Sequence, residues 1–290
     1  MNSAEITDAS FRAAVEAIDC GDVVVLRELL EADASLVVRR LDRPAEGYFA
    51  RPYLLWFVAE NPIRHEKLPA NIVEVAEVIL LALRAGGDPG YSFIVDNTMG
   101  LVCTGRIPKE CGVQIPLMEL LVRYGAAVKG SVLGAIGQRN FEAARWLLAH
   151  GSSYDPGTAV GLDDVEGAAR LAGEATASQL YVALVVAAFF GKAEMIRLLL
   201  GAGVDVNGSG TSEDFGGFHS HASALHQAVH SGSIEAVRLL VEAGADRFAK
   251  DSVYGGTPIG WARYMREEAV GVEEKGRFGE IEGFLGQEVG

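Results

Sequence analysis

A short phrase recurs along the chain and limits what the chain can fold into. Each copy begins with Gly or Asn, continues through an acidic or small residue, and ends in an apolar run that closes on Leu-Leu or a similar pair. The clearest copies occupy residues 191–200 and 232–241. The copies begin at positions 21, 71, 112, 140, 161, 191 and 232, so the gaps range from 21 to 50 residues. Such a period predicts stacked structural units, none stable without its neighbours.

Each copy has the pattern of a helix followed by a glycine turn. Ile234, Val237 and Leu240 recur at three- and four-residue spacing, which places them on one helical stripe. A glycine such as Gly203 or Gly244 follows the apolar run, and glycine is the preferred residue just after the end of a helix. We expect a second, shorter helix before five of the copies, at residues 11–19, 54–59, 132–137, 181–190 and 224–229. The sequence therefore predicts an all-α chain of paired helices.

The net charge of the chain disfavours some classes of partner. With 39 Asp and Glu against 25 Lys and Arg, the net charge is -14. An acidic surface repels phosphate backbones and anionic headgroups, so we expect no nucleic-acid partner and no membrane partner. Nucleic-acid binding is a disfavoured alternative. It would require a positive face formed by the locally basic stretch at residues 104–145.

Cysteine usage and the N-terminal segment point to a reducing compartment. Three cysteines, Cys20, Cys103 and Cys111, are too few and too scattered for a disulfide framework, and we interpret all three as packing residues. No apolar run is long enough to cross a membrane, and residues 1–22 lack the basic start of an export signal. The expected location is cytoplasmic.

Residues 179–264 carry the motif of a known repeat family. Residues 223–228 (Ser-Ala-Leu-His-Gln-Ala) stand at a Thr-Pro-Leu-His-x-Ala position, and residues 256–262 start the next repeat. The chain thereby resembles the ankyrin-repeat family, less closely over residues 11–35, 70–90 and 117–155. The resemblance implies one α-solenoid over residues 1–290 with about 7–8 repeats. It would have short hairpin loops, irregular repeat lengths, long inserted loops, and caps at 1–19 and 265–290.

The resemblance also implies functional and structural roles. In that family the concave face and the loop tips bind partner proteins, and catalysis is unusual. His226 occupies the repeat's own histidine position, which implies a structural hydrogen bond between neighbouring hairpins. Thr257 and Pro258 stand at the start of the following repeat and are expected to be structural.

Two irregular segments interrupt the first half of the chain. Residues 48–69 combine aromatic and basic side chains, which are common at interaction hot spots. We expect Tyr48, Phe49, Tyr53 and Arg64 to contact a partner; the alternative is that this segment, with Trp56 and Phe57, is a buried inner helix. In the connection 89–112, apolar residues are expected to replace a regular inner helix.

A third segment, residues 207–222, is rich in glycine and leads into a cluster of histidines. We expect binding contacts from Phe215, Phe218, His219, His221 and His230. A zinc site within the histidine cluster, with His226 and His230 one helical turn apart and Asp214 as an oxygen ligand, is the weaker alternative, so no metal is predicted.

No catalytic motif and no cofactor motif is recognisable, and we assign no catalytic residue. The leading hypothesis is a non-catalytic module that binds another protein through the concave face and the irregular loops. Its acidic charge favours a basic partner segment. The alternative is an enzyme or small-ligand binder that uses the loop at 207–230.

Overall fold

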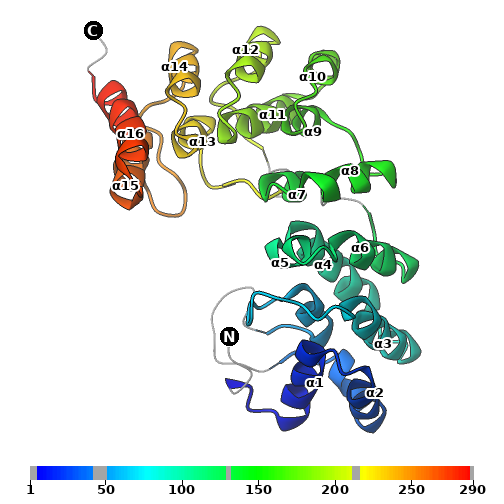
Figure 1. Ribbon diagram of the computed structural model, residues 1–290. Helices are drawn as coiled ribbons and strands as arrows, with labels where there is room; N and C mark the ends of the chain where they lie inside the picture. Colours follow the sequence, from blue (N-terminus) through cyan, green and yellow to red (C-terminus); the bar gives the residue numbers. More distant parts are fainter. Residues whose placement is uncertain (1–4, 42–50, 129–131, 211–215, 288–290) are drawn as a thin grey trace. The chain divides into compact units, whose positions relative to one another are not determined.

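The computed structural model describes residues 5–41, 51–128, 132–210 and 216–287 (Figure 1). Its chain divides into two compact units, which we call unit 1 and unit 2. Unit 1 contains residues 1–131 and 138–152, and unit 2 contains residues 132–137 and 153–290. The predicted single array over residues 1–290 stays a prediction, and each unit is described by itself.

Unit 1 contains three helix pairs with additional short helices. Contacts between consecutive first helices and between consecutive second helices form its two layers. The pairs are α1 (Ala9–Cys20) with α2 (Val23–Ala32), η4 (Leu54–Ala59) with α3 (Ile72–Ala85), and α4 (Tyr91–Thr104) with α6 (Gln114–Arg123). The remaining helices are η2 (Ala34–Val37), α5 (Arg106–Glu110) and α8 (Phe141–Ala149). Between the layers lies an apolar core, in which the rings of Phe11 and Phe57 meet edge to face at 5.8 Å.

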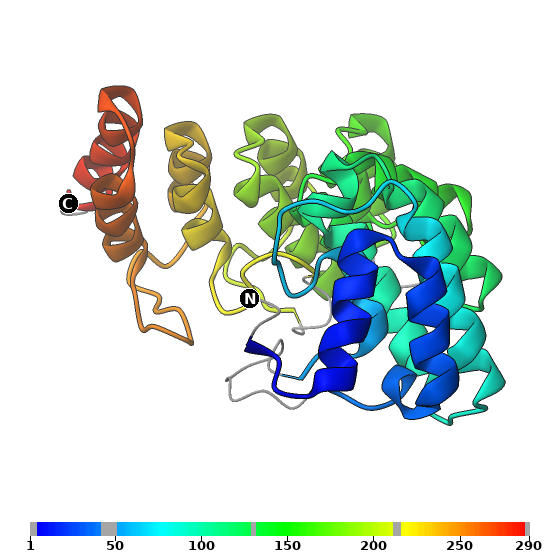
Figure 2. The same ribbon diagram turned by 60° about the horizontal axis from the view of Figure 1, so that its bottom comes forward.

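Unit 2 repeats the same arrangement in four pairs after a lone first helix, α7 (Val132–Gly137), which contacts α9. The pairs are α9 (Pro156–Gly161) with α10 (Val165–Ala172), α11 (Ala177–Phe189) with α12 (Ala193–Gly201), α13 (Ala224–Ser231) with α14 (Ile234–Glu242), and α15 (Pro258–Glu268) with α16 (Val272–Leu285). The first helices α9, α11, α13 and α15 contact one another in sequence, as do the second helices. The connection between α14 and α15 extends away from these helices (orange in Figure 2).

Local sequence signals explain where these helices begin and end. The Asp8 carboxylate accepts a hydrogen bond from the Phe11 amide at 3.0 Å, and the Asp22 carboxylate accepts one from Val25 at 3.0 Å. At the other ends, Gly203 and Gly244 adopt φ angles of 83° and 91°, which side chains with a Cβ rarely adopt. Six of the seven copies of the repeated phrase correspond to the second helices of these pairs, and the copy at residues 140–148 corresponds to α8.

Two expectations were wrong. The connection 89–112 was expected to lack a regular inner helix, yet α4 provides one of 14 residues, with Ile94, Val95 and Met99 buried. Cys20 was expected to be buried, but it is exposed, because it ends α1 next to the Gly21 turn. Cys103 is buried, and burial raises its thiol pKa to about 12. Within the described residues, no helix is both long and apolar enough to cross a bilayer.

Candidate functional site

Segment 48–69 mixes buried and accessible side chains. Tyr48 and Phe49 lie outside the described residues. Trp56 and Phe57 belong to the core of η4, which confirms the alternative of a buried inner helix for them. Tyr53 is half-buried, with its ring 5.6 Å from that of Trp56.

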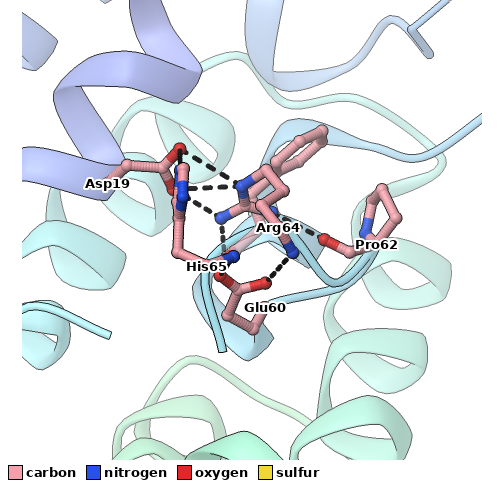
Figure 3. Close-up of polar contacts among 6 residues, drawn as sticks. Asp19, Glu60, Pro62, Arg64 and His65 are labelled. Carbon is pink, nitrogen blue, oxygen red and sulfur yellow. Dashed lines mark hydrogen bonds and ion pairs between the residues drawn. The ribbon is translucent and has the colours of Figure 1, made fainter. Parts of the chain in front are cut away.

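Arg64 is enclosed by its own loop rather than offered to a partner. Its side chain is 0% exposed, and its Nη2 lies 2.6 Å from the Asp19 carboxylate at the end of α1 (Figure 3). The same guanidinium donates to the carbonyl groups of Pro62 and Phe57 at 2.9 and 3.3 Å. It also lies 4.7 Å from the centre of the Phe57 ring. The structure therefore corrects the expected contact role of Arg64, because its side chain is buried and bonded to Asp19, Pro62 and Phe57.

Two further polar groups complete this ion pair cluster. The Glu60 carboxylate accepts the backbone amides of Arg64 and His65, at 2.6 and 2.9 Å (Figure 3). His65 approaches Asp19 from the solvent side, with Nε2 3.2 Å from Oδ2. The cluster fixes the loop after η4 onto α1, which is a structural function.

In unit 2, the expected binding residues gather around the end of α11. Phe215 and Asp214 lie outside the described residues. Phe218 is buried, and its ring lies 5.0 Å from that of Phe189 and 6.1 Å from that of Phe190. The described part of loop 207–222 is therefore anchored on α11 by aromatic packing.

Three of the expected histidines meet in the same place. The His219 ring lies 4.8 Å from that of His230 and 5.6 Å from that of His221. The His230 ring stacks on Phe189 at 5.2 Å, and Trp261 of α15 closes the cluster 5.6 Å from His219. In the described parts of the chain, no three His, Cys, Asp or Glu side chains are grouped to hold a metal ion.

The environment of His219 changes its protonation. Burial first, and then the neighbouring His230 and His221, lower the pKa of His219 to about 4. Its Nε2 atom is buried and has no hydrogen-bond partner among the described residues. The ring is therefore neutral at pH 7 and acts as an aromatic packing group.

This lowered pKa predicts acid sensitivity of unit 2. An unfolded histidine titrates near pH 6.5, so neutral His219 stabilises the fold fully above that pH. The contribution is lost as the pH falls from about 6.5 to about 4, and amounts to about 1 kcal/mol after allowance for the partly exposed ring. His219→Phe should reduce the drop in melting temperature between pH 7.5 and pH 5, measured by circular dichroism. The exposed His150, replaced by Gln, is the control and should leave the drop unchanged.

His226 is buried between two helix pairs. Its Nε2 donates to the Gly256 carbonyl at 3.0 Å, so Nδ1 accepts from the Ser223 hydroxyl at 2.8 Å. Burial lowers the pKa of His226, against the opposing effects of the Gly256 carbonyl and Asp251. Thr257 caps α15 through the Gly260 amide at 3.3 Å, and Pro258 is its first residue. The hydrogen bond from His226 to Gly256 thus joins α13 to the segment between α14 and α15.

Two strongly exposed aromatic residues of unit 2, Phe248 and Tyr254, were not predicted from the sequence. Phe248, Val253 and Tyr254 are 80%, 61% and 81% exposed on the connection between α14 and α15. Tyr254 reaches the histidine cluster, since its ring lies 5.8 Å from that of His221. We call Phe248, Val253, Tyr254 and His221 the hairpin surface. One sequence signal for their exposure was available. These residues lie between the Gly244 turn and Thr257, in a connection between two helices.

The family comparison agrees with this architecture. The family model described as ankyrin repeats (3 copies) matches residues 166–251 and 184–271. No curated protein sequence matches the chain. Among solved structures, the ankyrin repeat domain of Bcl-3, described as a unique member of the IkappaB protein family, is 20% identical. The match covers 78% of this chain and 96% of that chain, with a TM-score of 0.33. Residues 166–271 therefore match the ankyrin-repeat family model, in agreement with the resemblance seen in the sequence of residues 179–264.

Proposed function

We propose that the chain binds a partner protein through the hairpin surface of unit 2. Ankyrin repeats are generally protein–protein interaction modules. The observation that supports this surface is the exposure of two aromatic rings, Phe248 and Tyr254, on a connection that extends from the helix pairs (Figure 2). Large exposed aromatic side chains cost free energy in water and are typical of interaction hot spots.

The connection holds these rings on a defined backbone. The Asp251 carboxylate accepts the amides of Val253 and Tyr254 at 3.1 and 2.6 Å. The Ser252 amide donates to the His221 carbonyl at 2.8 Å, which joins the connection to the loop before α13. A preformed surface loses less conformational entropy on binding than a flexible one.

Charge indicates the chemistry of the partner. Residues 153–290 contain 20 Asp and Glu but only 10 Lys and Arg. An acidic unit attracts a basic segment, and the faces of exposed Phe and Tyr rings attract Lys and Arg side chains. We therefore propose a basic peptide segment as the ligand of the hairpin surface.

The alternative of a catalytic or small-ligand site under loop 207–230 is not adopted. Phe218, His219 and His230 pack their rings against Phe189, which gives these side chains a role in anchoring the loop.

The proposal predicts which peptides the full chain selects from a displayed random library. We expect enrichment in Lys and Arg, and an affinity that falls with salt. The double variant Phe248→Ser, Tyr254→Ser should weaken the selected peptides at least about 10-fold by isothermal titration calorimetry, because hot-spot aromatics carry much of the binding energy.

The matched control is the double variant Val270→Ser, Val272→Ser, which removes two equally exposed apolar side chains of unit 2 (91% and 90%) outside the hairpin surface. It should bind like the parent chain. Peptides without basic enrichment, or equal binding by both double variants, would contradict the proposal.

A further inference from the structure

An exposed arginine of unit 1 lies in a cluster of three aromatic rings. The Arg40 guanidinium carbon is 4.7 Å from the centre of the Tyr53 ring, 5.8 Å from Trp56 and 5.9 Å from Phe93. The rings also contact each other, with Tyr53 5.6 Å from Trp56 and 6.2 Å from Phe93. We call these four residues the arginine platform.

The backbone holds Arg40 in this position. Arg40 and Tyr53 form an antiparallel β-bridge, and the Leu41 amide donates to the Pro52 carbonyl at 2.9 Å. Trp56 is buried in η4, Tyr53 is half-buried and Phe93 of α4 is 50% exposed. The platform thus has a rigid base and an apolar rim, and Arg40 itself is exposed to solvent.

Stacking on the rings uses the flat faces of the guanidinium and leaves the N–H donors at its edge available. No Asp or Glu among the described residues forms an ion pair with Arg40, whereas its neighbour Arg39 pairs with Asp8 at 2.9 Å and with Asp33 at 3.4 Å. The two adjacent arginines therefore differ: Arg39 is neutralised within the fold, and Arg40 is oriented without a counter-charge from the described residues.

We propose that the arginine platform binds a carboxylate of an acidic peptide segment. The planar guanidinium edge matches a carboxylate in a bidentate geometry. Residues 39–67 contain six Lys and Arg against four Asp and Glu, so this stretch is locally basic in an acidic chain. The half-exposed Phe93 ring offers an apolar contact to a side chain beside the carboxylate.

The arginine platform is independent of the hairpin surface. The hairpin surface lies in unit 2 and is proposed for a basic segment, whereas the platform lies in unit 1 and binds the opposite charge. Loss of one activity in a variant therefore leaves the other available as a folding control.

The test uses the full chain and a short fluorescein-labelled peptide with the repeat Glu-Glu-Leu, compared with the same peptide carrying Gln for Glu. Fluorescence anisotropy should show binding of the Glu peptide only. Arg40→Gln should weaken it at least about 10-fold, and Arg40→Lys should weaken it less, because lysine keeps the charge but not the bidentate edge. Phe93→Ala should also weaken it.

The matched control is Arg145→Gln, which removes the same charge from an exposed helical position of unit 1 and should change the affinity by less than about twofold. The proposal is overturned if Arg40→Gln binds as well as the parent chain, or if the parent chain does not prefer the Glu peptide. Equal competition by inorganic phosphate and by unlabelled Glu peptide would also overturn it, since the site would then recognise small anions in general.

Discussion

Replacing Arg64 with Met should destabilise unit 1 by about 3 kcal/mol or more and lower its melting temperature by about 10 °C. The substitution keeps the length and the apolar stem of the side chain but leaves the Asp19 carboxylate, which is only 11% exposed, without its main counter-ion. It also leaves the carbonyl groups of Pro62 and Phe57 without their donor. Breaking a buried ion pair from one side is costly for these reasons. Thermal and urea unfolding followed by circular dichroism would measure the loss.

Two control variants distinguish the effect of burying the ion pair on stability from the effect of removing a charge. Arg106→Met removes an arginine whose ion pairs with Glu66 and Glu110, both at 2.9 Å, are exposed, and should cost less than about 0.5 kcal/mol. The double variant Asp19→Asn, Arg64→Met removes both buried charges and should be more stable than Arg64→Met alone. Equal costs for Arg64→Met and Arg106→Met would show that the buried pair contributes nothing.

Patterns within a short stretch of sequence were sufficient to predict the helices that follow the repeated phrase. The second helices follow from apolar spacing within ten or so residues and from the glycine after each, as in α14 with Val237, Leu240 and the Gly244 turn. The contact that begins α1 is equally local, because the N-cap residue Asp8 accepts a hydrogen bond from the amide three residues later.

Contacts between distant segments could not be predicted in this way. Arg64 was expected at a surface because a basic residue in an irregular segment is usually exposed, but its carboxylate partner lies 45 residues earlier. α4 was missed because Asn97, Thr98 and Gly100 interrupt its apolar pattern. In the folded chain, the Thr98 hydroxyl donates to the Ile94 carbonyl at 2.7 Å, which satisfies this buried polar group inside the helix.

The histidine cluster of unit 2 was predicted only in part, again because some of its contacts join distant segments of the chain. The histidines His219, His221 and His230 are close in sequence, so their density was visible, but the contacts with Phe189 and Trp261 depend on the stacking of α11, α13 and α15. The hairpin surface was missed because the exposure of Phe248 and Tyr254 depends on which segments pack over their connection. Its position between the Gly244 turn and Thr257 was a signal, but it does not by itself identify the exposed rings.

Replacing Asp251 with Asn should destabilise unit 2 by about 3 kcal/mol and disorder the hairpin surface. The Asp251 side chain is buried, and its oxygens accept four hydrogen bonds, from the amides of Val253 (3.1 Å), Tyr254 (2.6 Å) and Gly256 (2.8 Å) and from Trp261 Nε1 (3.1 Å). An asparagine of the same shape turns one acceptor into a donor, so at least one buried N–H group loses its partner. Asp246→Asn is the matched control, because this carboxylate of the same connection is exposed and accepts from the Phe248 amide at 2.8 Å, and should cost less than about 1 kcal/mol.

The pH dependence gives a second readout for Asp251. Burial alone raises its carboxyl pKa, but the hydrogen bonds from Tyr254, Trp261, Gly256 and Val253 outweigh that effect and lower the pKa to about 2. Because an unfolded aspartate titrates near pH 3.9, ionised Asp251 stabilises unit 2 above that pH, and the stability is lost as the pH falls toward 2. Asp251→Asn should flatten the unfolding profile in this acid range while leaving the His219 effect between pH 6.5 and 4. A variant that keeps the full acid transition would assign that transition to other carboxylates, and would contradict the role of Asp251 in holding Tyr254 and Trp261 together.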